Sequence, residues 1–224
     1  SLNPRMTVED IVREPLDIFK IGTRPERQKK VEEIIDIVGL RKTHLTRYPH
    51  EFSGGQRQRI GIARTMVLRP ELVIADEPVS ALDVSIQSQI LNLMNDLQKE
   101  FQLTYIFIAH NLSVVEYISD RVAVMYLGNI VELGDRKDIF ASPRHPYTKS
   151  LLASIPNPNP RLRTKKVPLQ GEVPSSLNPP SGCAFHPRCA YATAECKINK
   201  PKLSVDSGDL HKPNNHQVAC YHPL

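Results

Sequence analysis

The sequence predicts an α/β fold whose functional site lies at the ends of parallel strands. Two short apolar runs, residues 72–75 and 105–109, have the composition of strands buried on both faces of a parallel sheet. Apolar residues at helical spacing occupy 31–38 before these strands and 86–97 between them. A glycine-rich turn opens one further helix. Helices that alternate with apolar strands are typical of the α/β class.

Residues 1–50 are predicted to form connected helices. Thr7 is a suitable N-cap, and the acidic residues Glu9 and Asp10 follow it in the first turn. The apolar residues between 31 and 38 lie on one helical face, and Gly39 is a natural end for that helix.

The glycine-rich turn is a candidate phosphate site. Ser53, Gly54 and Gly55 leave the backbone bare in front of a helix predicted to begin near Gln56, so free N–H groups and the helix dipole can meet an anion. The alternative for an isolated Ser-Gly-Gly is an ordinary capping turn. The apolar strand just downstream favours the phosphate site.

Polar residues follow both predicted strands. Asp76 and Glu77 end the first strand, where the chemistry of parallel sheets is found. Asp76 is suited to hold magnesium through water, and Glu77 is suited to orient or deprotonate an attacking water. His110 directly follows the second strand. A single histidine is usually structural, but this position also fits a residue that senses phosphate.

The remaining chain is predicted as a helix over 84–100, a helix over 113–119, a hairpin of 122–126 with 130–133, and helical pieces at 138–141 and 147–154. Composition then changes. Thirteen of the nineteen prolines lie beyond residue 140, and segments 155–163 and 175–182 are predicted to be extended linker.

Four motifs together resemble those of ABC-type ATPases. SGGQRQR is similar to their signature motif, VIADEP to the Walker B strand, SALD to the D-loop, and His110 to the switch histidine. Longer stretches, MYLGNIVELG and SPRHPYTKSLL among them, resemble the ATP-binding subunits of bacterial oligopeptide and dipeptide importers.

The resemblance implies an ABC-type P-loop ATPase fold with a helical subdomain over 1–52, the remaining ATPase core over 53–155, and a proline-rich linker with a cysteine-bound extension over 156–224. It implies that Glu77 is the catalytic base, His110 the γ-phosphate sensor and Asp76 the magnesium residue. Ser53, Gly54, Gly55 and Gln56 then contact ATP in trans, and the dimer D-loop comprises Ser80, Ala81, Leu82 and Asp83.

A P-loop is not found in the sequence. None of the ten glycines begins the pattern G-x-x-x-x-G-K-[ST]. Together with the start at Ser1 rather than methionine, this predicts a chain truncated before the Walker A motif and the Q-loop, which alone is expected to be inactive.

The function implied is ATP hydrolysis, with Mg²⁺, that powers import of di- or oligopeptides. The partners implied are a second ATPase subunit (identical or a paralogue), two membrane-spanning permease subunits and an external peptide-binding protein. The resemblance also implies that the chain lies peripherally at the cytoplasmic face of the bacterial plasma membrane. The alternatives are a soluble ABC-type ATPase of DNA repair or translation, and a non-hydrolysing half-site or metal-dependent docking module.

Composition argues against nucleic acid as a partner. The formal net charge is +5, but residues 161–224 hold nine Lys and Arg against four Asp and Glu, so the preceding part is neutral. Few aromatic residues interleave with these basic ones, which favours a solvated tail. No run approaches the roughly 18 apolar residues of a membrane helix.

All four cysteines, Cys183, Cys189, Cys196 and Cys220, lie in this tail. A reducing compartment disfavours disulfides, so metal is the preferred interpretation. The absence of C-x-x-C pairs disfavours zinc. CAFHPRC resembles a C-terminal motif of the peptide-importer ATPases, which implies a 4Fe-4S cluster on the four cysteines. The alternatives are a zinc site, unliganded cysteines and disulfide-bonded cysteines. A mixed site that also uses nearby histidines is a further alternative, with His186, His216 and His222 as candidates.

Overall fold

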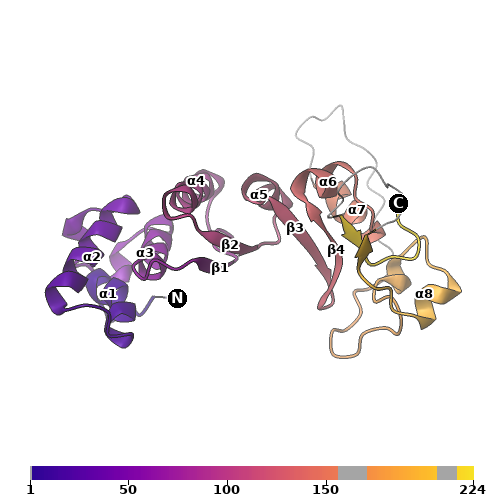
Figure 1. Ribbon diagram of the computed structural model, residues 1–224, viewed down its shortest axis with the longest axis horizontal. Coiled ribbons are helices and arrows are strands. Elements are labelled where there is room, and N and C mark those ends of the chain that lie inside the picture. Colours follow the sequence, from indigo (N-terminus) through magenta and orange to yellow (C-terminus); the bar gives the residue numbers. More distant parts are fainter. Residues whose placement is uncertain (1, 156–170, 206–215) are drawn as a thin grey trace. The chain divides into compact units, whose positions relative to one another are not determined.

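The computed structural model describes residues 2–155, 171–205 and 216–224 (Figure 1). The chain divides into two compact units, Ser1–Asn111 and Leu112–Leu224. Within the described ranges, no helix has both the length and the apolar character needed to cross a membrane. The linker predicted over 155–163 lies almost entirely outside the described residues.

The first unit is mainly helical. Thr7 caps the first helix by accepting a hydrogen bond from the backbone N–H of Asp10 (3.2 Å), as predicted. Gly39, with φ +74°, ends the second helix, and Leu40 N–H donates back to the Ile35 carbonyl (3.0 Å) in a Schellman turn. The helices of this unit are α1 Val8–Ile18, α2 Arg24–Ile37, α3 Gly54–Met66 and α4 Val84–Phe101, with the short 3₁₀ turns η1 Lys42–His44 and η2 Pro49–Glu51.

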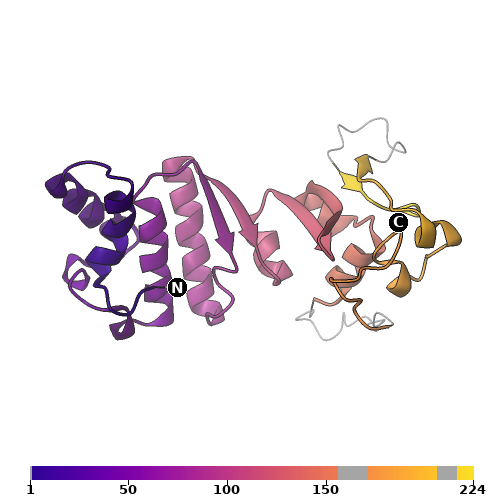
Figure 2. The ribbon, with the colours of Figure 1, turned by 90° about the horizontal axis from the view of Figure 1, so that it is seen from below.

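Two parallel strands, β1 Leu72–Asp76 and β2 Thr104–Ile108, form the sheet of this unit. Their positions confirm the predicted strands. The predicted burial on both faces is wrong, because Ile74 is 65% exposed. Val73 and Tyr105 point to the opposite face and pack against the helical core, so the helices cover one face of this sheet only (Figure 2).

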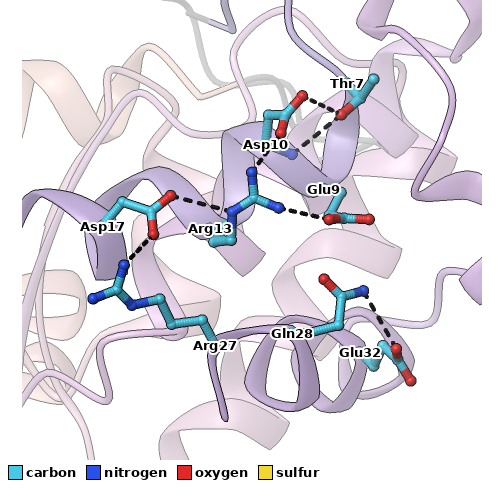
Figure 3. Close-up of polar contacts among 8 residues, drawn as sticks. All are labelled: Thr7, Glu9, Asp10, Arg13, Asp17, Arg27, Gln28 and Glu32. Carbon is cyan, nitrogen blue, oxygen red and sulfur yellow. Dashed lines mark hydrogen bonds and ion pairs between the residues drawn. The ribbon is translucent and has the colours of Figure 1, made fainter. Parts of the chain in front are cut away.

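A charged network joins α1 to α2 (Figure 3). Arg13 donates to three carboxylates of its own helix, and Asp17 also accepts from Arg27 of α2. The two arginines hold the pKa of Asp17 below its usual value, chiefly through the hydrogen bond from Arg27. These two helices are therefore tied by ionic hydrogen bonds as well as by apolar packing. The other two carboxylates on Arg13 are Glu9 (2.6 Å) and Asp10 (2.7 Å).

The second unit is built on a four-stranded antiparallel sheet in the order β3-β4-β6-β5. The predicted hairpin is confirmed, and its two-residue turn has positive φ at both Leu127 and Gly128, as in type I′ turns. Strands from the cysteine-bearing tail complete this sheet. The elements are α5 Leu112–Ile118, β3 Arg121–Tyr126, β4 Asn129–Asp135, α6 Arg136–Ala141, α7 Pro146–Ala153, η4 His186–Arg188, α8 Ala194–Ile198, β5 Ser204–Val205 and β6 Gln217–Val218.

Phe185 lies at the centre of the second core. It is 1% exposed, and its ring contacts those of Tyr126 (5.3 Å between centroids), Tyr147 (5.3 Å) and His145 (5.7 Å). These partners come from β3 and from the start of α7. The tail thus supplies the central side chain of a core shared with the preceding hairpin.

A buried carboxylate holds β6 to β4. Glu132 is fully buried, and its oxygens accept hydrogen bonds from the backbone N–H groups of Arg144 (2.7 Å) and His145 (3.0 Å). The same carboxylate bonds to Nε2 of His216 (2.7 Å). The ring of His216 lies over Gly134, where a Cβ would come within 3.0 Å of it. A buried polar group of this kind is stable only when its hydrogen bonds are made.

We expect His216→Ala to lower the free energy of unfolding of the second unit by about 1–3 kcal/mol, because a buried oxygen of Glu132 then loses a hydrogen-bond partner. Denaturant unfolding monitored by tyrosine fluorescence measures the effect. His222→Ala is the matched control, because the hydrogen bond of that ring joins it to Thr193 (3.0 Å), which is exposed. Equal losses in both variants would contradict a special role for the Glu132 contact.

Candidate functional site

The predicted phosphate site forms the first turn of α3, which begins two residues earlier than predicted. The Ser53 hydroxyl accepts from Gln56 N–H (3.3 Å), and the Gln56 side chain accepts from Ser53 N–H (3.1 Å), which together make a capping box. Ser53 and Gly54 are exposed. The N–H groups of Gly54 and Gly55 take no part in this capping box, and such first-turn N–H groups are available to an anion.

The two glycines of this turn pack closely against the D-loop region. A Cβ on Gly54 would lie 3.3 Å from Cδ2 of Leu82, and one on Gly55 would collide with Cγ2 of Ile86. Glycine at position 55 is therefore needed for this packing, and a side chain at position 54 would be tightly confined. Ser80, Ala81, Leu82 and Asp83 form the connection from β1 to α4, and Asp83 caps α4 by accepting from Ile86 N–H (3.0 Å).

Glu77 and His110 are brought together from the ends of two neighbouring strands. Because β1 and β2 are parallel, both side chains lie at the same edge of the sheet. Nδ1 of His110 is 3.0 Å from Oε1 of Glu77. This hydrogen bond is the main reason that the pKa of Glu77 lies below its usual value, so the carboxylate is ionised at neutral pH.

The backbone of Glu77 has an unusual conformation. Its φ is +46°, in the left-handed region that residues other than glycine rarely adopt. The conformation is held by a hydrogen bond from Glu77 N–H to the Ile108 carbonyl (2.9 Å) and by one from the Ser80 hydroxyl to the Glu77 carbonyl (3.1 Å). Strain of this kind is concentrated at functional sites. Asp76, the last residue of β1, is exposed beside it.

The structure thus makes two groups of the predicted residues. The signature residues meet the D-loop, and Glu77 meets His110. Among the described residues, no hydrogen bond joins Ser53 or Gln56 to Glu77 or His110. The contact between Gly55 and Ile86 was not predicted from the sequence. The available signal was that Ile86, an apolar β-branched residue, lies three positions after the helix-capping Asp83.

Comparison with known proteins agrees with these motifs. The family model described as "ABC transporter" matches residues 1–80, and that described as "Oligopeptide/dipeptide transporter, C-terminal region" matches residues 131–196. The di/tripeptide transport ATP-binding protein DppF of Pseudomonas aeruginosa is 50% identical over 222 residues, which cover 99% of this chain and 67% of DppF. The chain belongs to the ATP-binding proteins of oligopeptide and dipeptide ABC transporters.

Other members of this ABC family are equally similar. The oligopeptide transport ATP-binding protein AppF of Bacillus subtilis and the dipeptide transport ATP-binding protein DppF of Haemophilus influenzae are each 52% identical over 99% of this chain. The chain spans 66% of the length of each of these two relatives. A solved dimeric structure of MJ0796, a bacterial ABC transporter cassette, matches with a TM-score of 0.53 and 29% identity, over 61% of this chain and 59% of that one. The fold is that of an ABC cassette.

In this ABC protein, the four cysteines line one pocket of the second unit, and all four are free thiols. Burial raises the pKa of Cys183 and Cys189, and raises that of Cys220 to about 11, so these thiols are neutral at pH 7. Nearby backbone groups contact two of the sulfurs, since N–H of Tyr191 points at Sγ of Cys189 (3.4 Å) and N–H of His222 at Sγ of Cys220 (3.3 Å).

The predicted metal site on these cysteines is wrong. Across 2–155, 171–205 and 216–224, no group of three or more Cys, His, Asp or Glu side chains has an arrangement that can hold a metal ion. This overturns both the 4Fe-4S cluster and the zinc alternative. A thiol ligand must lose its proton, and burial favours the protonated form here. The histidines of the mixed alternative are engaged elsewhere: His186 with the Cys183 carbonyl, His216 with Glu132 and His222 with Thr193.

Proposed function

We propose that this chain is the catalytic part of an ATPase subunit that powers peptide import, and that Glu77 is its general base. The observation that carries the proposal is the Glu77–His110 pair, a 3.0 Å contact at the carboxyl ends of two parallel strands. The ionised Glu77 can accept a proton from an attacking water. His110 orients this carboxylate and is placed to contact the γ-phosphate.

Magnesium fits the residue beside this pair. Asp76 offers an exposed carboxylate at the strand end, and carboxylate oxygen is the ligand that Mg²⁺ prefers in proteins. When bound, the ion neutralises charge on the transferred phosphoryl group. Asp76 is the residue that we expect to hold it through water.

The signature turn serves a nucleotide held by a second cassette. Support comes from the separation of the two groups of residues and from the dimeric state named for the related MJ0796 cassette. The exposed N–H groups after Ser53 then contact the phosphates in trans, with Gly54, Gly55 and Gln56. Ser80, Ala81, Leu82 and Asp83 line the interface between cassettes. The 224 residues contain no Walker A pattern, so none of their lysines is assigned to that role.

The substrate and partners follow from the relatives. AppF and both DppF proteins are named for oligopeptide, dipeptide or tripeptide transport. The corresponding assembly contains two cassettes, two membrane-spanning permease subunits and an external peptide-binding protein. The cassette lies peripherally at the cytoplasmic face of the membrane, with α1 and α2 as its helical subdomain and residues 171–224 as a small C-terminal extension.

Reconstitution in lipid vesicles tests this function. We expect ATP-driven uptake of labelled di- or oligopeptides only when the ATPase, permease and binding-protein components are all present, with ATP hydrolysis stimulated several-fold by loaded binding protein. The proposal would be contradicted if the rate of ATP hydrolysis did not change with the permease and rose with DNA or ribosomes. That result would favour a soluble ABC-type ATPase.

A further inference from the structure

The side chain of Arg59 links the signature helix α3 to the end of α2. Its Nη1 donates a hydrogen bond of 2.5 Å to the carbonyl oxygen of Val38, the C-cap residue of α2. Gly39 and Leu40 N–H groups already satisfy the carbonyls of Asp36 and Ile35 in the Schellman turn. The Val38 carbonyl is left at the negative end of the α2 dipole, where a guanidinium group is a favourable partner.

Gly39 is needed for this contact in two ways. Its φ of +74° turns the chain so that the Val38 carbonyl faces α3, a conformation that other residues rarely adopt. A Cβ at this position would lie 2.9 Å from Nη1 of Arg59 and displace the guanidinium. The hydrogen bond therefore depends on a residue of each helix.

The first turn of α3 has few other anchors. The buried residues of this helix are Gly55, Ile60, Ala63 and Met66. Ile60, Ala63 and Met66 pack in the core further along the helix. Gly55 lies against Ile86 at the start of α4. Phe52, directly before Ser53, is buried in the core that includes α1 and α2. Arg59 adds a hydrogen bond from within the helix to the end of α2.

The α1–α2 pair is held together by ionic and apolar contacts. Asp17 bonds to Arg13 within α1 and to Arg27 in α2 (Figure 3). Val31 and Ile35 of α2 are fully buried in the core that α1 shares. A displacement of this pair can reach α3 through the contacts between them, one of which is the hydrogen bond of Arg59 to Val38.

We propose that Arg59 is a positioning residue that makes the signature turn follow the α1–α2 pair. It sets the orientation of the N–H groups after Ser53 without touching the nucleotide itself. This inference rests on the proposed function for its effect on ATP, but the mechanical link stands on the hydrogen bond alone.

The test compares Arg59→Met, Gly39→Ala and Arg59→Lys with the control Arg64→Met in the last turn of the same helix. In the reconstituted complex, we expect the first two variants to raise KM for ATP about tenfold with kcat changed less than about threefold, as when uniform binding is lost. Arg59→Lys should recover part of the loss, and Arg64→Met should match the native protein.

Hydrogen exchange of the whole protein without nucleotide gives a second readout. We expect amides 56–58 to exchange about tenfold faster in Arg59→Met, while those of α4 change less than about twofold. Faster exchange confined to residues 38–40 would overturn the inference, because Arg59 would then only cap α2. A lower thermal midpoint with an unchanged KM for ATP would have the same meaning. If the native complex shows no ATP hydrolysis that depends on Glu77, the proposed function fails, and the exchange of amides 56–58 still decides the link.

Discussion

Replacing Glu77 by glutamine is expected to lower kcat for ATP hydrolysis by about 10²–10⁴-fold, the usual contribution of a positioned general base. Glutamine keeps the size of the side chain and its hydrogen bond to His110, but it cannot take a proton from water. ATP binding should be retained, so the two cassettes should accumulate in the closed, nucleotide-bound state. Phosphate release and size-exclusion chromatography with ATP measure the two effects.

The matched control for this substitution is Glu116→Gln on α5, which changes the same chemical group outside the proposed site. It should hydrolyse ATP at the native rate. Rapid phosphate release by Glu77→Gln would show that another group accepts the proton. Loss of ATP binding in that variant would instead show that Glu77 has a role in holding the nucleotide.

Replacing Phe185 by alanine is expected to cost about 3–5 kcal/mol of stability in the second unit, as for other fully buried aromatic side chains. The ring is 1% exposed and is enclosed by Tyr126, Tyr147 and His145, so its removal leaves a cavity that three aromatic neighbours cannot all fill. The measurement is the denaturant midpoint for loss of near-ultraviolet circular dichroism.

Leu177→Ala is the control for Phe185, because Leu177 is 95% exposed. That change should alter the free energy of unfolding by less than about 0.5 kcal/mol. If Phe185→Ala were equally mild, the tail would be an independent appendage, and its contacts with β3 and α7 would contribute little to stability.

The sequence was sufficient to predict the helices and strands of the first unit. Apolar runs located β1 and β2, and their parallel pairing brings Glu77 and His110 together as strand-end residues. Local patterns could not reveal that Ile74 is exposed, since burial depends on what covers each face of the sheet. They also gave no sign of Arg59, whose partner is a backbone carbonyl 21 positions away.

In the second unit, the sequence misled at the cysteines. Their grouping and the resemblance of CAFHPRC suggested a metal that organises the tail. In the described structure, the tail is organised by Phe185 and by the bond of Glu132 to His216, neither of which has a periodic signature. The four cysteines line a pocket, and burial raises the pKa of Cys183, Cys189 and Cys220 so that these three thiols stay protonated.

The pairing of β6 with β4 has a consequence for synthesis on the ribosome. Glu132 and His216 are 84 positions apart. At translation speeds of about 5–20 residues per second, β4 waits roughly 4–17 s for its partner. During that interval, a strand edge is unpaired and a carboxylate that will be buried remains in water. The second unit therefore reaches its final packing only after β6 has emerged, and its nascent form presents an open edge to which chaperones can bind.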